Sequence, residues 1–145
     1  MAKFVYKYES ILRIKEVLEK KILKEISEIE KEIEKLEEEK KKLITKRKIL
    51  GDKISSGKIK AIDYKSAKSL CKTLEKDISS LGRRIEDWKT KKSQKLNELL
   101  ERKKEKKILE ALKEKQYEDF LFESNREELK QLNEIAINNF NRKES

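Results

Sequence analysis

Apolar residues recur every three or four positions along most of the chain, and this spacing limits the fold more than any other feature. Such a repeat places apolar side chains along one face of an α-helix. None of the 145 residues is proline, so no residue interrupts a long helix by lacking a backbone donor. Charged residues make up 47% of the chain and hydrophobic residues 35%. This composition is too polar for a conventional globular core but is typical of a coiled coil.

The glycines divide this pattern into two helices. Gly51 and Gly57 bracket the only turn-rich stretch. Gly51 is expected to end the first helix, because glycine accepts the left-handed backbone angles found there. We therefore predict a single coiled-coil domain over residues 1–145, with helix one at about 4–50, a turn at about 51–58 and helix two at about 59–140.

Each helix carries a heptad-like seam of apolar residues. In helix one the seam residues are Ile11, Ile14, Leu18, Ile22, Ile26, Ile29, Ile33, Leu36 and Leu43. In helix two they are Tyr64, Ala67, Cys71, Leu74, Ile78, Leu81, Ile85, Trp88 and Leu99. Antiparallel pairing of the seams places Leu36 opposite Leu74. It also places Ile22 opposite Trp88, with the centre of the turn at Ser55. The expected fold class is all-α, an antiparallel two-helix coiled-coil hairpin with a longer second helix.

The second helix extends beyond the first. Phe4 is expected opposite residue 106 or so, which leaves residues 107–145 without a partner in the hairpin. The stripe of apolar residues there is expected to bind another protein or a second copy of the chain. Its members are Ile108, Leu109, Leu112, Tyr117, Phe120, Leu121, Leu129, Leu132, Ile135, Ala136 and Phe140.

Residue types that carry out catalysis are scarce. The chain has no histidine, the commonest general base near neutral pH, and one cysteine is too few for a zinc-type cluster. It has no glycine-rich phosphate loop. The sequence therefore predicts a protein that is not an enzyme, with no cofactor, metal or small-molecule substrate. Cys71 and Trp88 are expected to pack in the seam, with a redox role and a partner contact as their respective alternatives.

A net charge of +10 permits nucleic acid, acidic lipid or acidic protein as a partner. Residues 89–107 carry nine lysines or arginines against three glutamates. This run is either a solvated helix face or a contact with an acidic partner, so a nucleic-acid-binding hairpin is the alternative function. Aromatic residues are not interleaved with the run, which argues against stacking of single strands.

The expected location is the cytosol. No stretch approaches the roughly 20 apolar residues of a membrane span, and the first residues lack the apolar run of a signal peptide. A single cysteine suits a reducing compartment.

Three segments resemble the flagellar export protein FliJ family. The opening FVYKYESILR, residues 4–13, is similar to the family's aromatic-x-aromatic start and leucine-rich helix. The segment LCKTLEKDI, residues 70–78, resembles the stretch after the turn. The segment ELKQLNEIA, residues 128–136, is similar to the C-terminal signature, with Asn133 in place of the usual aspartate. The resemblance covers essentially the whole chain.

This resemblance implies a non-enzymatic component of the flagellar type III export apparatus, and so a role in motility. Members of the family insert into the ring of the hexameric export ATPase FliI and promote its assembly and activity. They also contact the export gate protein FlhA, and some bind export chaperones. The protein would then be cytoplasmic, held at the cytoplasmic face of the membrane through the apparatus.

The resemblance also implies which residues contact these partners. The residues expected to face the ATPase are Leu12, Arg13, Lys15, Leu132, Glu134 and Ile135. The gate contact is expected near Leu70 and Leu74. Leu74 is also a predicted seam residue, so its burial would conflict with a free contact role.

Self-association into a structural homo-oligomer is a further alternative to the export function.

Overall fold

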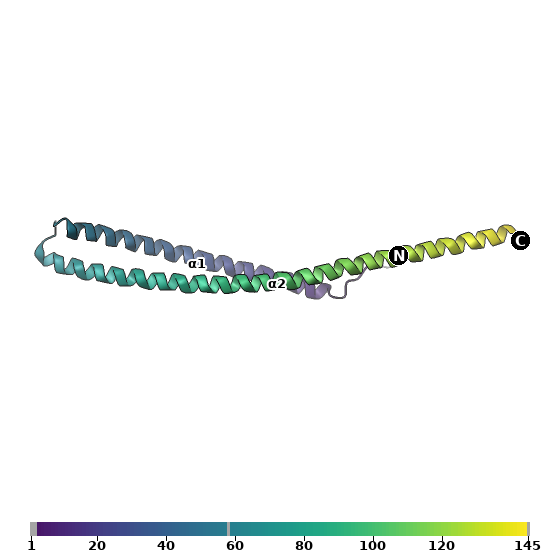
Figure 1. Cartoon of the computed structure of the whole chain (residues 1–145), viewed down its shortest axis with the longest axis horizontal. Coiled ribbons are helices and arrows are strands. Elements are labelled where there is room, and N and C mark those ends of the chain that lie inside the picture. The colour runs from purple at the N-terminus through teal and green to yellow at the C-terminus, as the bar shows by residue number, and fades with distance from the viewer. Residues whose placement is uncertain (1–2, 58, 145) are drawn as a thin grey trace. The chain divides into compact units, whose positions relative to one another are not determined.

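The protein consists of two long helices and no strand within the part of the chain that the structure, a computed structural model, describes (Figure 1). The described residues are 3–57 and 59–144, apart from the side chain of Ile62. Lys58, the last residue of the predicted turn, and the outermost chain ends lie outside them. Helix α1 is Glu9–Ser55, with 47 residues, and α2 is Ala61–Glu144, with 84 residues. The prediction of an all-α fold with a longer second helix is confirmed.

Two units share these helices. The hairpin unit comprises Lys20–Leu100, and the terminal unit comprises Met1–Glu19 together with Glu101–Ser145. The prediction that residues 1–145 form a single coiled-coil domain stays a prediction.

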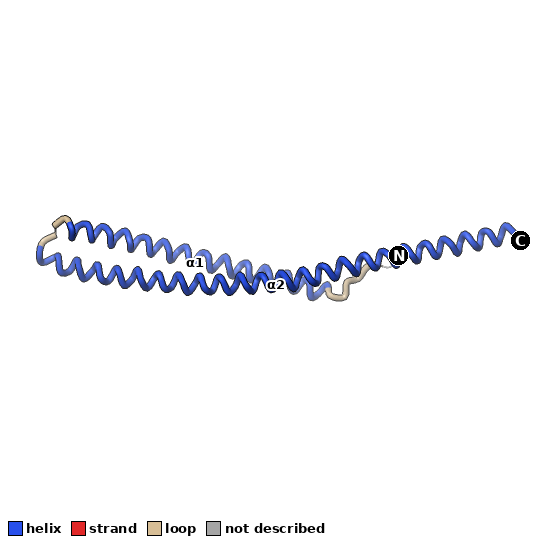
Figure 2. Tube along the Cα trace, in the orientation of Figure 1, coloured by secondary structure: helices blue, strands red, loops and turns tan. Residues whose placement is uncertain are grey.

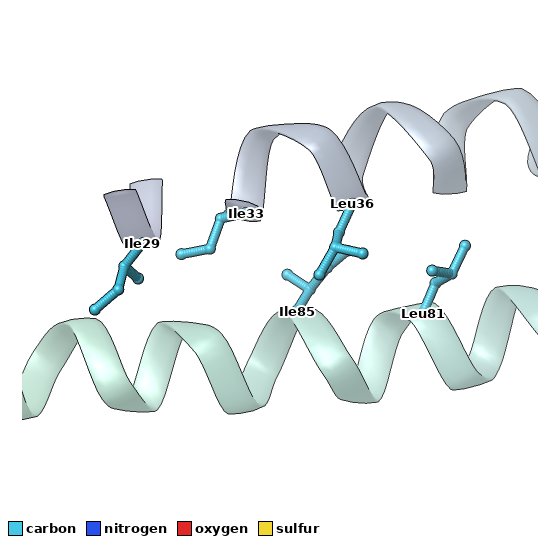
Figure 3. Packing of buried hydrophobic residues seen from close by; sticks show 5 residues of the cluster. All are labelled: Ile29, Ile33, Leu36, Leu81 and Ile85. Carbon is cyan, nitrogen blue, oxygen red and sulfur yellow. The ribbon is translucent and has the colours of Figure 1, made fainter. Parts of the chain in front are cut away.

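The core of the hairpin unit is one row of seam side chains between α1 and α2. Its main cluster contains five buried residues, with Leu43 and Trp88 packed against it. Leu36 is the most deeply buried of them, at 1% exposure. Figure 3 shows this cluster, which consists of Ile29, Ile33, Leu36, Leu81 and Ile85. Full burial of one such side chain stabilises a fold by about 1.5–3 kcal/mol, so this row holds the helices together.

The two seams pair in a different register from the one predicted from the sequence. Leu36 faces Ile85, eleven residues beyond its expected partner Leu74 (Figure 3). Ile22 packs with Leu99, which is again eleven residues beyond the expected partner. Eleven residues are about three helical turns, so the shift presents the same face of α2 and still brings apolar residues together.

The position of the turn explains part of this shift. Helix α1 does not end at Gly51, as expected, but continues to Ser55. The residue with left-handed angles is Gly57, with φ of 67°, and its N–H donates to the carbonyl of Ile54 at 3.4 Å. Glycine inside a helix costs only about 1 kcal/mol relative to alanine, which one further turn of packing offsets. The connection therefore lies at residues 56–60, later than predicted.

Among the described residues of the hairpin unit, four ion pairs join α1 and α2. The glutamate-rich part of α1 meets the first lysines of the basic run at 89–107, and the remaining pair lies near the turn. The pairs are Glu25–Lys95 at 2.7 Å, Glu30–Lys92 at 3.3 Å, Glu37–Lys89 at 3.8 Å and Arg47–Glu75 at 2.9 Å. Exposed pairs of this kind contribute about 0–1 kcal/mol each, so they favour the observed register more than they stabilise the fold.

Because these ion pairs require ionised carboxylates, the fold is expected to be less stable at acid pH. The Lys95 ammonium, whose Nζ lies 2.7 Å from Glu25 Oε2, lowers the pKa of the Glu25 carboxyl below its ordinary value. A carboxylate with a lowered pKa stabilises the fold above its unfolded pKa and loses that effect as pH falls through its folded pKa. Because the chain has no histidine, the melting temperature is expected to be flat between about pH 6 and 8 and to fall below about pH 4.5.

Circular dichroism melts across pH test this expectation. The melting temperature of the Glu25→Gln variant should fall less on acidification than that of the wild type. Glu28→Gln is the matched control, because Glu28 is exposed and forms no ion pair with the described residues. Equal acid sensitivity of the two variants would contradict the role of Glu25.

In the terminal unit, the residues before α1 run in extended form beside α2 (Figure 2). Their side chains alternate, because Phe4 and Tyr6 pack against α2 while Val5 between them is exposed. The Tyr6 hydroxyl donates to the Leu109 carbonyl at 2.7 Å. The ring of Phe4 lies against two aromatic rings of α2, those of Tyr117 at 5.2 Å and Phe120 at 5.6 Å between centroids.

This packing corrects the extent of the unpaired part of α2. An extended chain covers about 3.3 Å per residue against 1.5 Å in a helix, so the segment reaches further along α2 than a helix would. The part of α2 that the described residues before α1 leave uncovered therefore begins after Phe120, and not at residue 107.

Removal of the Tyr6 hydroxyl is expected to lower the stability of the protein measurably. Tyr6→Phe should lower the free energy of unfolding by about 1 kcal/mol, because a buried hydroxyl loses its hydrogen bond. Urea unfolding followed by circular dichroism measures this. Tyr64→Phe is the control, since the Tyr64 ring is exposed and its hydroxyl donates to none of the described residues. An equal loss in both variants would contradict the assignment.

Candidate partner-binding surface

The C-terminal extension, defined as residues 121–144 of α2, exposes its apolar side chains. None of them is buried, and no other described element covers them. The large ones are Leu121, Phe122, Leu129, Leu132, Ile135, Ile137 and Phe140. Scattered apolar residues on a surface are normal, but a run of seven on one helix marks an interaction site.

A large part of this set lies on one helical face. Phe122, Leu129, Leu132, Ala136 and Phe140 follow one another at steps of seven, three, four and four, which is the spacing of one amphipathic stripe. The stripe is therefore suited to a groove on a partner, where the helix face would be buried.

Three of the predicted ATPase-facing residues lie on the C-terminal extension. Leu132 is 61% exposed and Ile135 is 55% exposed, with Glu134 exposed between them. Sequence reasoning omitted Phe122 and Ile137 from the stripe, although Phe122 precedes Leu129 by one heptad and carried the required signal.

The other three predicted ATPase-facing residues lie near the start of α1. Arg13 is exposed and forms a weak pair with Glu9 at 4.0 Å. Lys15 is half-buried and is bound to Glu105 of α2. Leu12 is only 5% exposed, so its side chain packs within the terminal unit and offers no surface to a partner.

The structure does not bring the two groups of predicted residues together. Lys15 marks the position of the first group on α2 through its contact with Glu105. Leu132 lies 27 residues beyond Glu105 in the same helix, which is about 40 Å along the axis. The two groups are therefore separate patches, and the C-terminal extension is the larger apolar one.

The predicted gate residues lie in the hairpin unit and differ in exposure. Leu70 is 51% exposed, whereas Leu74 is buried in the seam. Both line a shallow hollow between α1 and α2, whose other lining residues are Lys46, Ile49, Leu50 and Lys53. Leu70 is thus accessible from this hollow, and Leu74 forms part of its floor.

Cys71 and Trp88 occupy the seam. Cys71 is a free, buried thiol, and Trp88 is half-buried against the main cluster with Lys91 over its ring at 4.4 Å. No group of three or more metal-binding side chains occurs within residues 3–57 and 59–144. Neither helix contains, in its described part, an apolar segment long enough to cross a membrane.

A sequence model of the flagellar FliJ protein family matches residues 4–145, nearly the entire chain. The chain belongs to the FliJ family. It is therefore a component of the flagellar export apparatus, as the resemblance of its opening, middle and closing segments predicted. FliJ-family proteins are structural components of that apparatus. Comparisons of this FliJ-family chain with curated proteins and with solved structures gave no match.

Proposed function

We propose that this FliJ-family protein binds the export ATPase FliI, promotes assembly and activity of its ring, and connects it to the export gate protein FlhA. It would act in the cytoplasm, at the membrane-embedded apparatus, and would also contact export chaperones. The observation that carries the proposal is the C-terminal extension, whose apolar stripe is exposed along some six helical turns of α2.

The mechanism is physical and involves no covalent step. An amphipathic helix that binds one conformational state of the ATPase subunits more tightly than another shifts the population toward that state. If the helix binds the assembled ring and not the separate subunits, ring assembly is favoured by mass action. Both effects require only an apolar stripe that can enter a groove.

Contact with the gate would use the hollow of the hairpin unit. Leu70 is its accessible apolar residue, and Lys46 and Lys53 at its margin favour an acidic partner surface. Leu74 supports the floor of the hollow and would act by packing. Leu70→Gln is therefore expected to weaken capture of the gate protein and to leave ATPase stimulation unchanged.

The proposal is tested with the organism's own export ATPase. Leu132→Gln/Ile135→Gln should weaken binding and half-maximal ATPase stimulation by at least about tenfold, because two desolvated anchors are lost. Glutamine has a helix propensity close to that of leucine, so α2 should persist. Leu96→Gln/Leu100→Gln is the matched control, with two exposed leucines of α2 in the hairpin unit.

Full stimulation by the Leu132→Gln/Ile135→Gln variant would refute the proposed contact. Equal losses in the variant and in its control would point to a general effect of surface polarity. Light scattering on the wild type tests the alternative that the stripe binds a second copy of the chain, since a stable dimer at low concentration would occupy it.

The nucleic-acid alternative loses support from the ion pairs. Lys89, Lys92 and Lys95 are all bound to glutamates of α1, and Lys106 is bound to Glu19. Four of the nine basic residues of the run at 89–107 are thus engaged by glutamates of α1.

A further inference from the structure

The net charge of the protein is concentrated at one place. The hairpin tip, defined as residues 40–76, contains the end of α1, the turn and the start of α2. It carries 13 lysines or arginines and 3 aspartates or glutamates, a difference of +10. The whole chain also has a net charge of +10, so the remaining residues carry 26 charges of each sign. Everything outside the tip is therefore balanced.

Most of the described positive charges of the tip have no acidic partner among the described residues. Arg47 pairs with Glu75, and this is the one ion pair of the tip among the described residues. The described lysines of the tip are exposed, apart from half-buried Lys40, and Lys68 lies over the ring of Tyr64 at 5.1 Å. Since like charges at this density repel one another and destabilise the fold, the cluster indicates an anionic partner.

The residue types favour a diffuse anionic surface over nucleic acid. Twelve of the thirteen cations are lysines, which act as point charges, and the single arginine is already engaged by Glu75. Recognition of individual phosphates prefers the bidentate arginine fork. Tyr64 is the only aromatic residue of the tip, so there is no platform for stacked bases.

The arrangement also favours a lipid surface over a peptide in a groove. The lysines occur on both helices and in the turn, so contact with most of them requires a broad surface. Ile44, Ile49 and Leu70 are exposed among them. Lysines that surround exposed apolar side chains are typical of segments that lie at the headgroup region of a bilayer.

We propose that the hairpin tip docks directly on an anionic lipid surface. The lysines nearest the turn make the closest approach, because electrostatic attraction falls off within a Debye length of about 8 Å, or some five helical residues. Lys53, Lys60 and Lys65 lie within that distance of the helix ends, and Lys48 lies just beyond it. Each lysine at the surface raises the partition coefficient about fivefold, so the binding is reversible and salt-sensitive. This lipid contact goes beyond the proposed function, and it shares Lys53 and Leu70 with the hollow proposed for the gate.

Flotation with lipid vesicles tests the proposal on the full-length protein. The probes are vesicles of phosphatidylcholine alone and vesicles in which about a third of the lipid is phosphatidylglycerol. The wild type should float with the anionic vesicles at physiological ionic strength and should remain unbound with the neutral ones. Lys48→Gln/Lys53→Gln/Lys60→Gln/Lys65→Gln should lower the partition coefficient at least about tenfold.

A second variant with the same net charge serves as the matched control. It is Lys24→Gln/Lys31→Gln/Lys103→Gln/Lys107→Gln, which removes four exposed lysines outside the tip that form no ion pair with the described residues. It should bind anionic vesicles within about threefold of the wild type. All eight positions are exposed, so helical content by circular dichroism should be unchanged in both variants.

Three results would overturn the proposal. One is failure of the wild type to bind anionic vesicles. Another is an equal loss in the two variants, which would show that total charge and not the tip is responsible. The third is tighter binding of the wild type to a short RNA or DNA duplex than to anionic vesicles, with loss in the tip variant, which would identify nucleic acid as the partner of the tip.

Discussion

A chain that ends at Ser124 is expected to keep its helical packing and to lose all stimulation of the export ATPase. The contacts of Phe4 and Tyr6 with α2 fall at Leu109, Tyr117 and Phe120, all of which this chain retains. The described residues removed, 125–144, are exposed, so the melting temperature should change by no more than a few degrees. ATPase assays and thermal melts of the same preparation measure both effects.

A chain that ends at Lys106 provides the comparison. It lacks Leu109, Tyr117 and Phe120, so the segment before α1 loses its contacts as well as the C-terminal extension. This shorter chain should be measurably less stable, while the chain ending at Ser124 should not. Full stimulation by the chain ending at Ser124 would move the ATPase contact away from the extension, with the exposed patch at Arg13 as the next candidate.

Leu36→Ala is expected to lower the free energy of unfolding by about 2–4 kcal/mol. Leu36 is the most buried side chain of the main cluster, and truncation leaves a cavity between α1 and α2. That loss is a large fraction of the stability of an ordinary domain. Ile44→Ala is the control, because Ile44 is 46% exposed, and it should cost less than about 1 kcal/mol.

The same substitution decides the register of the hairpin. In a double-mutant cycle, Leu36→Ala and Ile85→Ala should show a coupling of about 0.5–3 kcal/mol, because the two side chains are in contact. Leu36→Ala and Leu74→Ala should be additive within about 0.5 kcal/mol. Strong coupling to Leu74 in place of Ile85 would restore the pairing expected from the sequence.

The sequence was sufficient to identify the buried face of each helix but not the register between them. Leu36 and Ile85 stand out in any heptad reading, and both are core residues. A periodic seam, however, matches its partner equally well after a shift of whole turns. The choice between registers rests on the turn, where Gly57 and not Gly51 adopts left-handed angles. Both glycines carry the same intrinsic preference, so only packing distinguishes them.

The candidate site, like the fold, could be predicted from the sequence only in part. The spacing of Leu129, Leu132 and Phe140 predicted an apolar face, and all three are exposed. The burial of Leu12 was harder to predict, because it depends on the reach of the segment before α1. Phe4, Val5 and Tyr6 are all apolar, so their sequence does not distinguish an extended segment from the helix that was predicted from about residue 4.

The single-row core of the hairpin unit determines how the unit responds to damage. The described buried side chains of that unit lie between the same two helices, with no second layer of described structure behind them. A compact intermediate that keeps its helices while its interior loosens needs an interior thick enough to stay collapsed. Here the loss of interhelical contact exposes both apolar faces to water at once, so secondary structure and packing should disappear in one transition.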